Sequence, residues 1–226
     1  MPASPISIPG RVVVFDYGEV ISHAPSAEDK QRLLAVGGIP EALASTFWER
    51  YWHHRPPLDQ GSVRVTDYWK TLASELGLEW TASQRHALWV ADFRGWWSID
   101  PGTLDLIERL HDGGTRVALL SNAGFDFASG FRHSPMSEFF EVMYVSAEMD
   151  AIKPDPEIYR EVAAGLGITL DQMIFIDNKL ENTDAAAELG VTAHHFTSVE
   201  GLETFLLDLG SSRSRGRNRC APSRYR

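Results

Sequence analysis

The stretch RVVVFDYGEV (residues 11–20) decides the fold of this chain. Four apolar residues, Val12 to Phe15, run straight into a carboxylate, Asp16, and a glycine follows at position 18. An uninterrupted apolar run is typical of a strand buried on both faces of a parallel sheet, because a half-exposed strand alternates. The stretch therefore predicts a buried parallel strand that delivers Asp16 to its carboxyl end.

Four later runs have the same character and read as further strands. They are RVALLS (116–121), EVMYVS (141–146), MIFID (173–177) and VTAHHF (191–196). Helical patterns long enough for right-handed crossovers occupy residues 101–114, 155–167, 181–190 and 198–210. In the second of them Asp155 is the expected N-cap and Gly167 the expected end. We expect an α/β fold, a doubly wound Rossmann-like parallel sheet of about five strands.

Residues 23–97 break this alternation and contain no convincing strand. They read as three or four helices, one starting after Pro40, one capped by Thr66 and one capped by Thr81. We interpret the segment as a helical cap inserted after the first strand. Residues 1–22 and 98–210 would then form the Rossmann-like core.

Charge is unevenly distributed along the 226 residues. Residues 211–226 hold six arginines and no acid, although the whole chain has a net charge of −10. We expect this Arg-rich tail to be disordered. The acidic remainder argues against nucleic acid as the main partner.

The single cysteine, Cys220, excludes an intramolecular disulfide and favours a reducing, cytoplasmic location. Residues 1–10 lack the basic and apolar regions of a signal peptide, and no stretch approaches 18 apolar residues. We therefore expect no contact with a membrane. The sequence leaves the oligomeric state open between a monomer and a homodimer.

Polar residues with chemical potential follow the predicted strands. In open α/β sheets, ligands bind at the carboxyl ends of the strands. The residues found there are Asp16, Ser121, Asn122, Lys153 just beyond the third strand, Asp177 and Asn178. Carboxylate oxygens suit Mg²⁺, and cationic or hydroxyl groups suit phosphate oxygens. The set predicts a site for a divalent cation and a phosphoryl group.

The stretches that carry these residues resemble four ordered signatures of the haloacid dehalogenase-like (HAD) hydrolase superfamily, in a phosphatase-type member with a helical cap. The stretches are FDYGEV, LLSNA, KPDPEIY and FIDNKLENTDAAAELG, and the resemblance covers roughly residues 11–196. It implies that Asp16 is a nucleophile that forms an aspartyl-phosphate. It also implies that Asp16, Asp177 and the backbone carbonyl of Gly18 hold Mg²⁺.

The same resemblance assigns roles to the remaining residues at the strand ends. Ser121 and Lys153 would act in catalysis and bind phosphoryl oxygens of the substrate, and Lys153 would also pair with the Asp16 carboxylate. Asn122 would bind the substrate or orient the loop that does. Asn182 would set the turn into its helix.

Two positions depart from the common phosphatase pattern. Gly18 stands where a second aspartate usually serves as general acid and base, and Asn178 stands where a second acid often follows the first. Glycine keeps the backbone carbonyl for the metal, but a positioned proton donor contributes roughly 10²–10⁴-fold to rate. Glu19 and His23 are candidate substitutes for the missing acid.

Three functions remain open on these grounds. The first is an Mg²⁺-dependent phosphatase that acts on a small phosphorylated metabolite and prefers good leaving groups. The second is a 2-haloacid dehalogenase, against which Asp177 argues because it would repel a carboxylate substrate. The third is a catalytically weak HAD-like protein that binds a ligand or partner.

Overall fold

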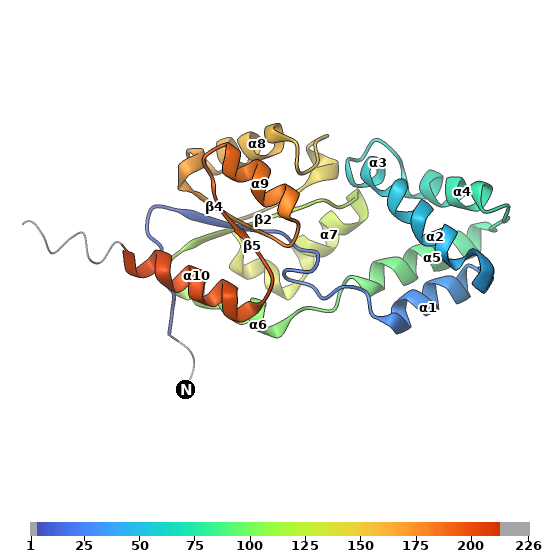
Figure 1. The fold of residues 1–226 in the computed structure, drawn as a ribbon, viewed down its shortest axis with the longest axis horizontal. Coiled ribbons are helices and arrows are strands. Elements are labelled where there is room, and N and C mark those ends of the chain that lie inside the picture. The colour runs from blue at the N-terminus through green and yellow to red at the C-terminus, as the bar shows by residue number, and fades with distance from the viewer. Residues whose placement is uncertain (1–3, 213–226) are drawn as a thin grey trace, which may run out of the picture.

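The computed structural model describes residues 4–212, and a five-stranded parallel sheet lies at its centre (Figure 1). The strands are β1 (Val12–Phe15), β2 (Arg116–Ser121), β3 (Val142–Val145), β4 (Met173–Asp177) and β5 (Thr192–His195). Their order is β3-β2-β1-β4-β5, and every neighbouring pair is parallel. This confirms the predicted fold class and all five predicted strands.

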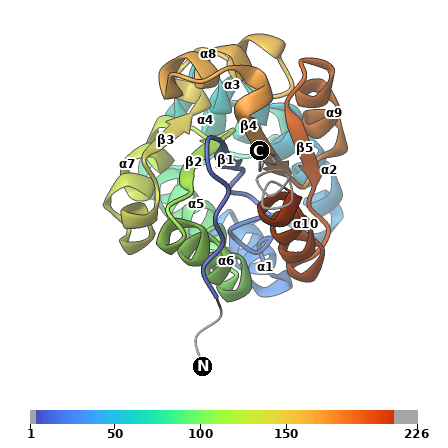
Figure 2. The same cartoon turned by 90° about the vertical axis from the view of Figure 1, so that its left-hand side faces the viewer.

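Successive residues of β1 feed two separate apolar layers, because side chains alternate across a strand. Val13 and Phe15 pack in one layer with α6 (Pro101–Asp112), α7 (Phe125–His133) and α10 (Val199–Ser212). Val12 and Val14 pack on the other face with α8 (Pro156–Leu166) and α9 (Leu180–Glu188). Figure 2 shows the sheet edge-on between these two layers. The four residues of β1 are fully buried, as their uninterrupted apolar character predicts.

Five helices follow β1 and lie together beyond one end of the sheet (Figure 1). They are α1 (Ala27–Val36), α2 (Glu41–His53), α3 (Arg55–Asp59), α4 (Val65–Glu75) and α5 (Ala82–Gly95). We refer to residues 27–95 as the helical segment. It has a core of its own, built around large buried side chains such as Phe47, Tyr51 and Trp69.

Helix ends test the capping predictions individually. Asp155 caps α8 by accepting a hydrogen bond from the backbone N–H of Glu157, as predicted. Thr81 caps α5 as predicted, and Gln84 returns a bond to the Thr81 backbone. The predicted cap at Thr66 is wrong, because α4 begins at Val65 and its N-cap, Arg64, makes no side-chain capping bond.

Helix α7 was not expected from the sequence. It contains Gly130, a residue that lowers helix propensity. The structure explains the glycine, since a Cβ at position 130 would lie 2.5 Å from the ring of Trp97. Short 3₁₀ turns also went unpredicted: η1 (Pro135–Phe139), η2 (Ser146–Glu148) and η3 (Leu170–Gln172).

At the carboxyl end, α10 continues to Ser212, two residues into the predicted tail. The rest of that tail, including Cys220, lies outside the described residues. Within residues 4–212, no helix combines the length and the apolar character needed to cross a membrane.

The two threonines provide a matched test of capping. We expect Thr81→Ala to lower the free energy of unfolding by about 1 kcal/mol, because it removes an N-cap bond. We expect Thr66→Ala to change it by less than about 0.5 kcal/mol, because Thr66 is an exposed residue within the first turn. Urea unfolding of both variants measures the difference. Equal losses would contradict the assignment of the α5 cap.

Candidate active site

Strand register places Asp16 beside Asp177. Phe15 of β1 is level with Ile176 of β4, so the next residue on each strand is an aspartate. The backbone N–H of Asp16 donates to the carbonyl oxygen of Ile176 at 2.9 Å, which extends the pairing by one residue. Two buried carboxylates therefore meet at the carboxyl edge of the sheet, and their like charges repel each other.

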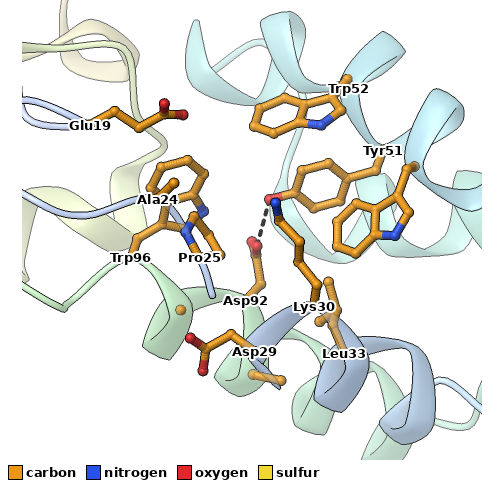
Figure 3. Close-up of a pocket in the computed structure, with 13 residues that line it drawn as sticks. Glu19, Ala24, Pro25, Asp29, Lys30, Leu33, Tyr51, Trp52, Asp92 and Trp96 are labelled. Atoms are coloured by element: carbon orange, nitrogen blue, oxygen red, sulfur yellow. Dashed lines mark hydrogen bonds between the residues drawn. The ribbon is translucent and has the colours of Figure 1, made fainter. Parts of the chain in front are cut away.

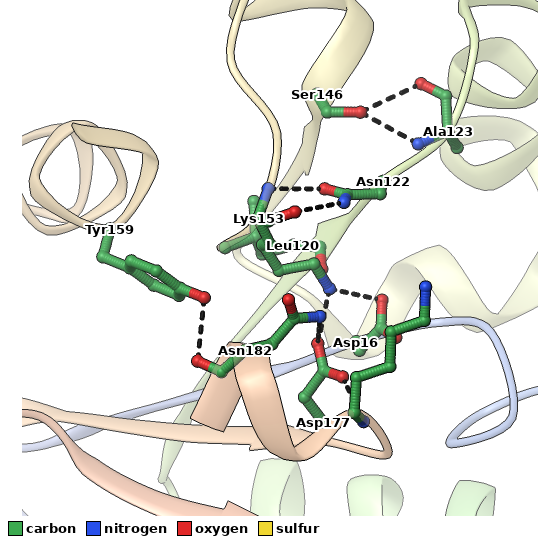
Figure 4. Close-up of polar contacts among 10 residues, drawn as sticks. Asp16, Leu120, Asn122, Ala123, Ser146, Lys153, Tyr159, Asp177 and Asn182 are labelled. Carbon is green, nitrogen blue, oxygen red and sulfur yellow. Dashed lines mark hydrogen bonds and ion pairs between the residues drawn. The ribbon is translucent and has the colours of Figure 1, made fainter. Parts of the chain in front are cut away.

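Lys153 separates the two carboxylates (Figure 4). Its ammonium donates to Asp16 Oδ1 at 2.7 Å, to Asp177 Oδ2 at 2.7 Å and to the carbonyl oxygen of Leu120 at 3.0 Å. All three of its hydrogens thus have acceptors, and the residue is only 3% exposed. A buried ammonium is tolerated when it is paired and hydrogen-bonded in this way.

The ionisation of this group reflects burial and charge together. Burial raises the pKa of Asp16 to about 6, against the lowering effect of Lys153, while Asp177 raises it further. Burial lowers the pKa of Lys153, but the attraction of Asp16 and Asp177 outweighs this and leaves the pKa raised. Lysine therefore stays protonated. Counted formally, two carboxylates and one ammonium leave one net negative charge in this group.

Asp177 is fixed by further hydrogen bonds. Its Oδ2 accepts from Asn182 Nδ2 at 2.9 Å, and its Oδ1 accepts from the backbone N–H of Lys179 at 2.8 Å. The hydroxyl of Tyr159 donates to the carbonyl oxygen of Asn182 at 2.9 Å. Asn182, expected to set a turn, thus also orients a carboxylate of the site.

Asn122 holds the loop that carries Lys153. Its Nδ2 donates to the Lys153 carbonyl oxygen, and its Oδ1 accepts from the Lys153 backbone N–H, both at 2.9 Å. The geometry matches the loop-orienting role, while substrate binding by Asn122 stays a prediction. Ser121, at the end of β2, is buried and lines the adjacent cavity.

That cavity has a volume of about 450 Å³ and lies between the strand ends and the helical segment. The predicted residues at the strand ends that line it are Asp16, Gly18, Ser121, Asn122, Lys153 and Asn178. Asp177 lies behind them, fully buried. Of the two candidate substitutes for the missing acid, Glu19 lines the cavity, whereas the imidazole of His23 lies 3.7 Å from Asp100.

The helical segment contributes Arg55 and Asp59 to the same cavity. The guanidinium of Arg55 donates to Asp59 at 2.9 Å, to Asp92 at 3.1 Å and to the Tyr51 hydroxyl at 2.7 Å. Burial raises the pKa of Asp59 to about 6 despite the opposing charge of Arg55. No pattern in the sequence marks these residues, since Arg55 merely precedes two prolines.

A second contact joins the helical segment to the sheet. The Ser146 hydroxyl donates to the carbonyl oxygen of Asp59 and accepts from the backbone N–H of Ala123. Gly61 has a φ of +84°, and a Cβ there would lie 2.6 Å from the carbonyl oxygen of Ala147. Glycine is therefore required at position 61 for the backbones to approach so closely.

The donors at the strand ends suit Mg²⁺. Two carboxylates and a backbone carbonyl are hard oxygen ligands, and the surplus negative charge around Asp16 would be compensated by a cation. Among the described residues, no cluster of three or more His, Cys, Asp or Glu side chains has the geometry to hold a metal. A cation here would therefore rely on two carboxylates, on backbone oxygen and on water or substrate.

Comparison with known proteins identifies the family. Residues 11–190 match the family model of the haloacid dehalogenase-like hydrolases, and the chain belongs to this family. It is therefore a hydrolase by family, as the resemblance of its strand-end signatures implied.

The individual relatives resemble this chain at low sequence identity. The sesquiterpene phosphatase astK of Aspergillus oryzae is 26% identical over 83% of this chain and 90% of its own. The D-ribitol-5-phosphate phosphatase of Bacteroides thetaiotaomicron is 25% identical over 79% of this chain and 87% of its own. A HAD family enzyme from the same bacterium, crystallised with magnesium and inorganic phosphate, has a TM-score of 0.67 at 21% identity, covering 83% of this chain and 94% of that one. This last similarity supports the fold.

Removing Lys153 tests its role between the carboxylates. We expect Lys153→Met to lower the free energy of unfolding by about 3–5 kcal/mol in EDTA, because two buried carboxylates lose their counter-charge. The exposed neighbour Lys179 serves as control, and Lys179→Met should cost less than about 0.5 kcal/mol.

The loss in free energy of unfolding caused by Lys153→Met should also depend on pH. A carboxyl group whose pKa is raised by folding binds protons more tightly in the folded state, so stability falls as pH rises through that pKa. Without Lys153 the pKa of Asp16 should rise beyond about 6. Urea unfolding should therefore show a larger deficit at pH 8 than at pH 5, and a pH-independent deficit would argue against this origin.

Proposed function

We propose that this protein is an Mg²⁺-dependent phosphatase that hydrolyses a small phosphorylated metabolite through an aspartyl-phosphate on Asp16. The observation that carries the proposal is the position of Asp16, held by Lys153 at the floor of a cavity. The names of two phosphatases among the relatives support it. The magnesium and phosphate bound by the structurally similar bacterial enzyme support the choice of cation and substrate group.

In the proposed reaction, an Asp16 carboxylate oxygen attacks phosphorus while the bond from phosphorus to the leaving oxygen breaks. The leaving oxygen takes the bonding electron pair. A water molecule then attacks the aspartyl-phosphate, restores the Asp16 carboxylate and releases inorganic phosphate. Ser121 and Lys153 bind the phosphoryl oxygens, and Asn122 keeps Lys153 in place.

Mg²⁺ would be held by Asp16, Asp177 and the carbonyl oxygen of Gly18. When bound, it supplies positive charge that offsets the repulsion between the phosphoryl group and the Asp16 carboxylate. The hydrogen bonds from Asn182 Nδ2 and from the backbone N–H of Lys179 hold the Asp177 carboxylate in one orientation.

We further propose that residues 23–97 act as a cap over the core formed by residues 1–22 and 98–210, and that the enzyme works in the cytoplasm as a monomer or homodimer. The cap assignment rests on the cavity, which is lined from both parts of the chain. The location rests on the single cysteine.

The central test is phosphate release from a panel of phosphorylated metabolites with Mg²⁺ or with EDTA. We expect release only with Mg²⁺, and none from Asp16→Asn, which keeps the shape but removes the nucleophile. If no compound releases phosphate while 2-chloropropionate releases chloride, the protein is a dehalogenase instead. An empty result in both assays would favour the binding-protein alternative.

The absence of an acid at position 18 predicts a bias among substrates. We expect faster hydrolysis of acetyl phosphate than of glycerol phosphate, because an acyl leaving group needs no protonation. Equal rates would contradict the bias.

Position 18 also allows a gain-of-function test. Among the described residues, a Cβ at Gly18 would meet the Trp96 ring at 3.6 Å, an ordinary contact distance. Gly18→Asp should therefore raise kcat/KM for glycerol phosphate by about tenfold or more, within the range for a general acid. Gly18→Asn, with the same shape and no acid, should not.

A further inference from the structure

A second, smaller chamber borders the active-site cavity, and Figure 3 shows the residues that line it. It has a volume of about 210 Å³ and shares Glu19, Trp52 and Trp96 with the larger cavity. Its remaining apolar lining comes from the helical segment and from the chain leading into it: Pro25, Leu33, Trp48, Tyr51 and Ala91. The two spaces therefore border each other at these three residues.

Trp52 and Trp96 stand at the border between the two chambers. Their rings pack edge to face, with centroids 6.3 Å apart. Trp52 is 51% exposed, although it lies beside a cavity and is one of the largest apolar side chains in the chain. Its exposed surface can cover an apolar ligand. Binding would then bury apolar surface of both the ligand and Trp52, which is favourable.

The two carboxylates that line the side chamber already have partners, whereas the buried indole N–H of Trp96 has none among the described residues. Asp92 accepts from the Tyr51 hydroxyl at 2.6 Å and from Arg55 at 3.1 Å. Asp29 accepts from the Ser26 hydroxyl at 2.6 Å. A sugar or polyol placed here would find these carboxylates engaged and would leave some of its own hydroxyls without partners.

Charge also distinguishes the chamber from the site of chemistry. Its other ionisable residues, Glu19 and Lys30, are exposed and can remain in water. The buried guanidinium of Arg55 is flanked by two carboxylates and offers no surplus positive charge for a second anionic group. Apart from the indole N–H of Trp96, the rest of the interior lining is aliphatic or aromatic.

On the basis of the proposed phosphatase activity, we infer that the group released from phosphate is an extended hydrocarbon group. It lies along the exposed surface of Trp52 and beside Trp96, with its far end in the side chamber. The phosphoryl group remains at Asp16 and Lys153, so one substrate spans both spaces. The names of the relatives do not make this choice, because one acts on a sesquiterpene compound and the other on a polyol phosphate.

The test is a series in which only the apolar length changes. Acetyl, butanoyl and hexanoyl phosphate release carboxylates of similar basicity, so differences in rate report binding of the chain and not leaving-group ability. We expect kcat/KM to rise about fourfold for each methylene that is fully buried, and at least about tenfold from acetyl to hexanoyl phosphate. Loss of the hydroxylamine-reactive acyl phosphate, corrected for spontaneous hydrolysis, gives the rates.

Three variants test where the hydrocarbon chain of the substrate binds. Trp52→Ala should lower the ratio of hexanoyl to acetyl kcat/KM by about fivefold or more. Ala24→Trp, which fills the chamber from an exposed position, should lower the same ratio. Leu207→Ala removes an equally exposed apolar side chain on α10 and should leave the ratio unchanged.

The outcomes separate the inference from the proposed function. Mg²⁺-dependent turnover that is abolished in Asp16→Asn but is independent of chain length would overturn the apolar substrate and leave the phosphatase standing. A length dependence that persists in both Trp52→Ala and Ala24→Trp would also overturn it, since the chain would then bind elsewhere. Failure to hydrolyse any member of the series or of the metabolite panel would overturn both.

Discussion

The structure depends on one electrostatic constraint at the edge of its sheet. Parallel strands lie about 4.8 Å apart, and the register of β1 and β4 sets Asp16 and Asp177 side by side at that spacing. Two buried carboxylates so close destabilise the fold unless a cation lies between them, and Lys153 supplies it. The same contacts that permit this chain to fold also orient its candidate nucleophile.

The polar groups of the site and its apolar surface are carried by different parts of the fold. The polar groups stand on strand ends and on loops tied to them by backbone hydrogen bonds, such as the pair between Asn122 and Lys153. The apolar surface stands on helices with a separate core. None of the hydrogen bonds that hold Asp16 and Lys153 involves Trp52, so substitutions around Trp52 can alter which molecule is bound while the geometry around Asp16 stays the same.

Features that depend on residues close together in the sequence could be predicted, whereas features that depend on contacts between distant residues could not. The strands and the set at their ends were predictable, because apolar runs and the rule of parallel sheets need only local patterns. Helix α7 could not be predicted, because glycine is needed at position 130 to leave room for the ring of Trp97. That contact is known only from the fold. Arg55 was missed for the same reason, since its partner Asp92 lies on another helix.

The contact at Gly61 has a consequence for reading mutations. At this position the backbone of the helical segment packs directly against the backbone of Ala147, and there is no room for even a methyl group. An alanine would force apart the segment that carries Arg55 and the 3₁₀ turn η2 (Ser146–Glu148), which precedes the loop that carries Lys153. Inactivity caused by such a change would record a lost fit between two backbones and would say nothing about the chemistry of residue 61 itself.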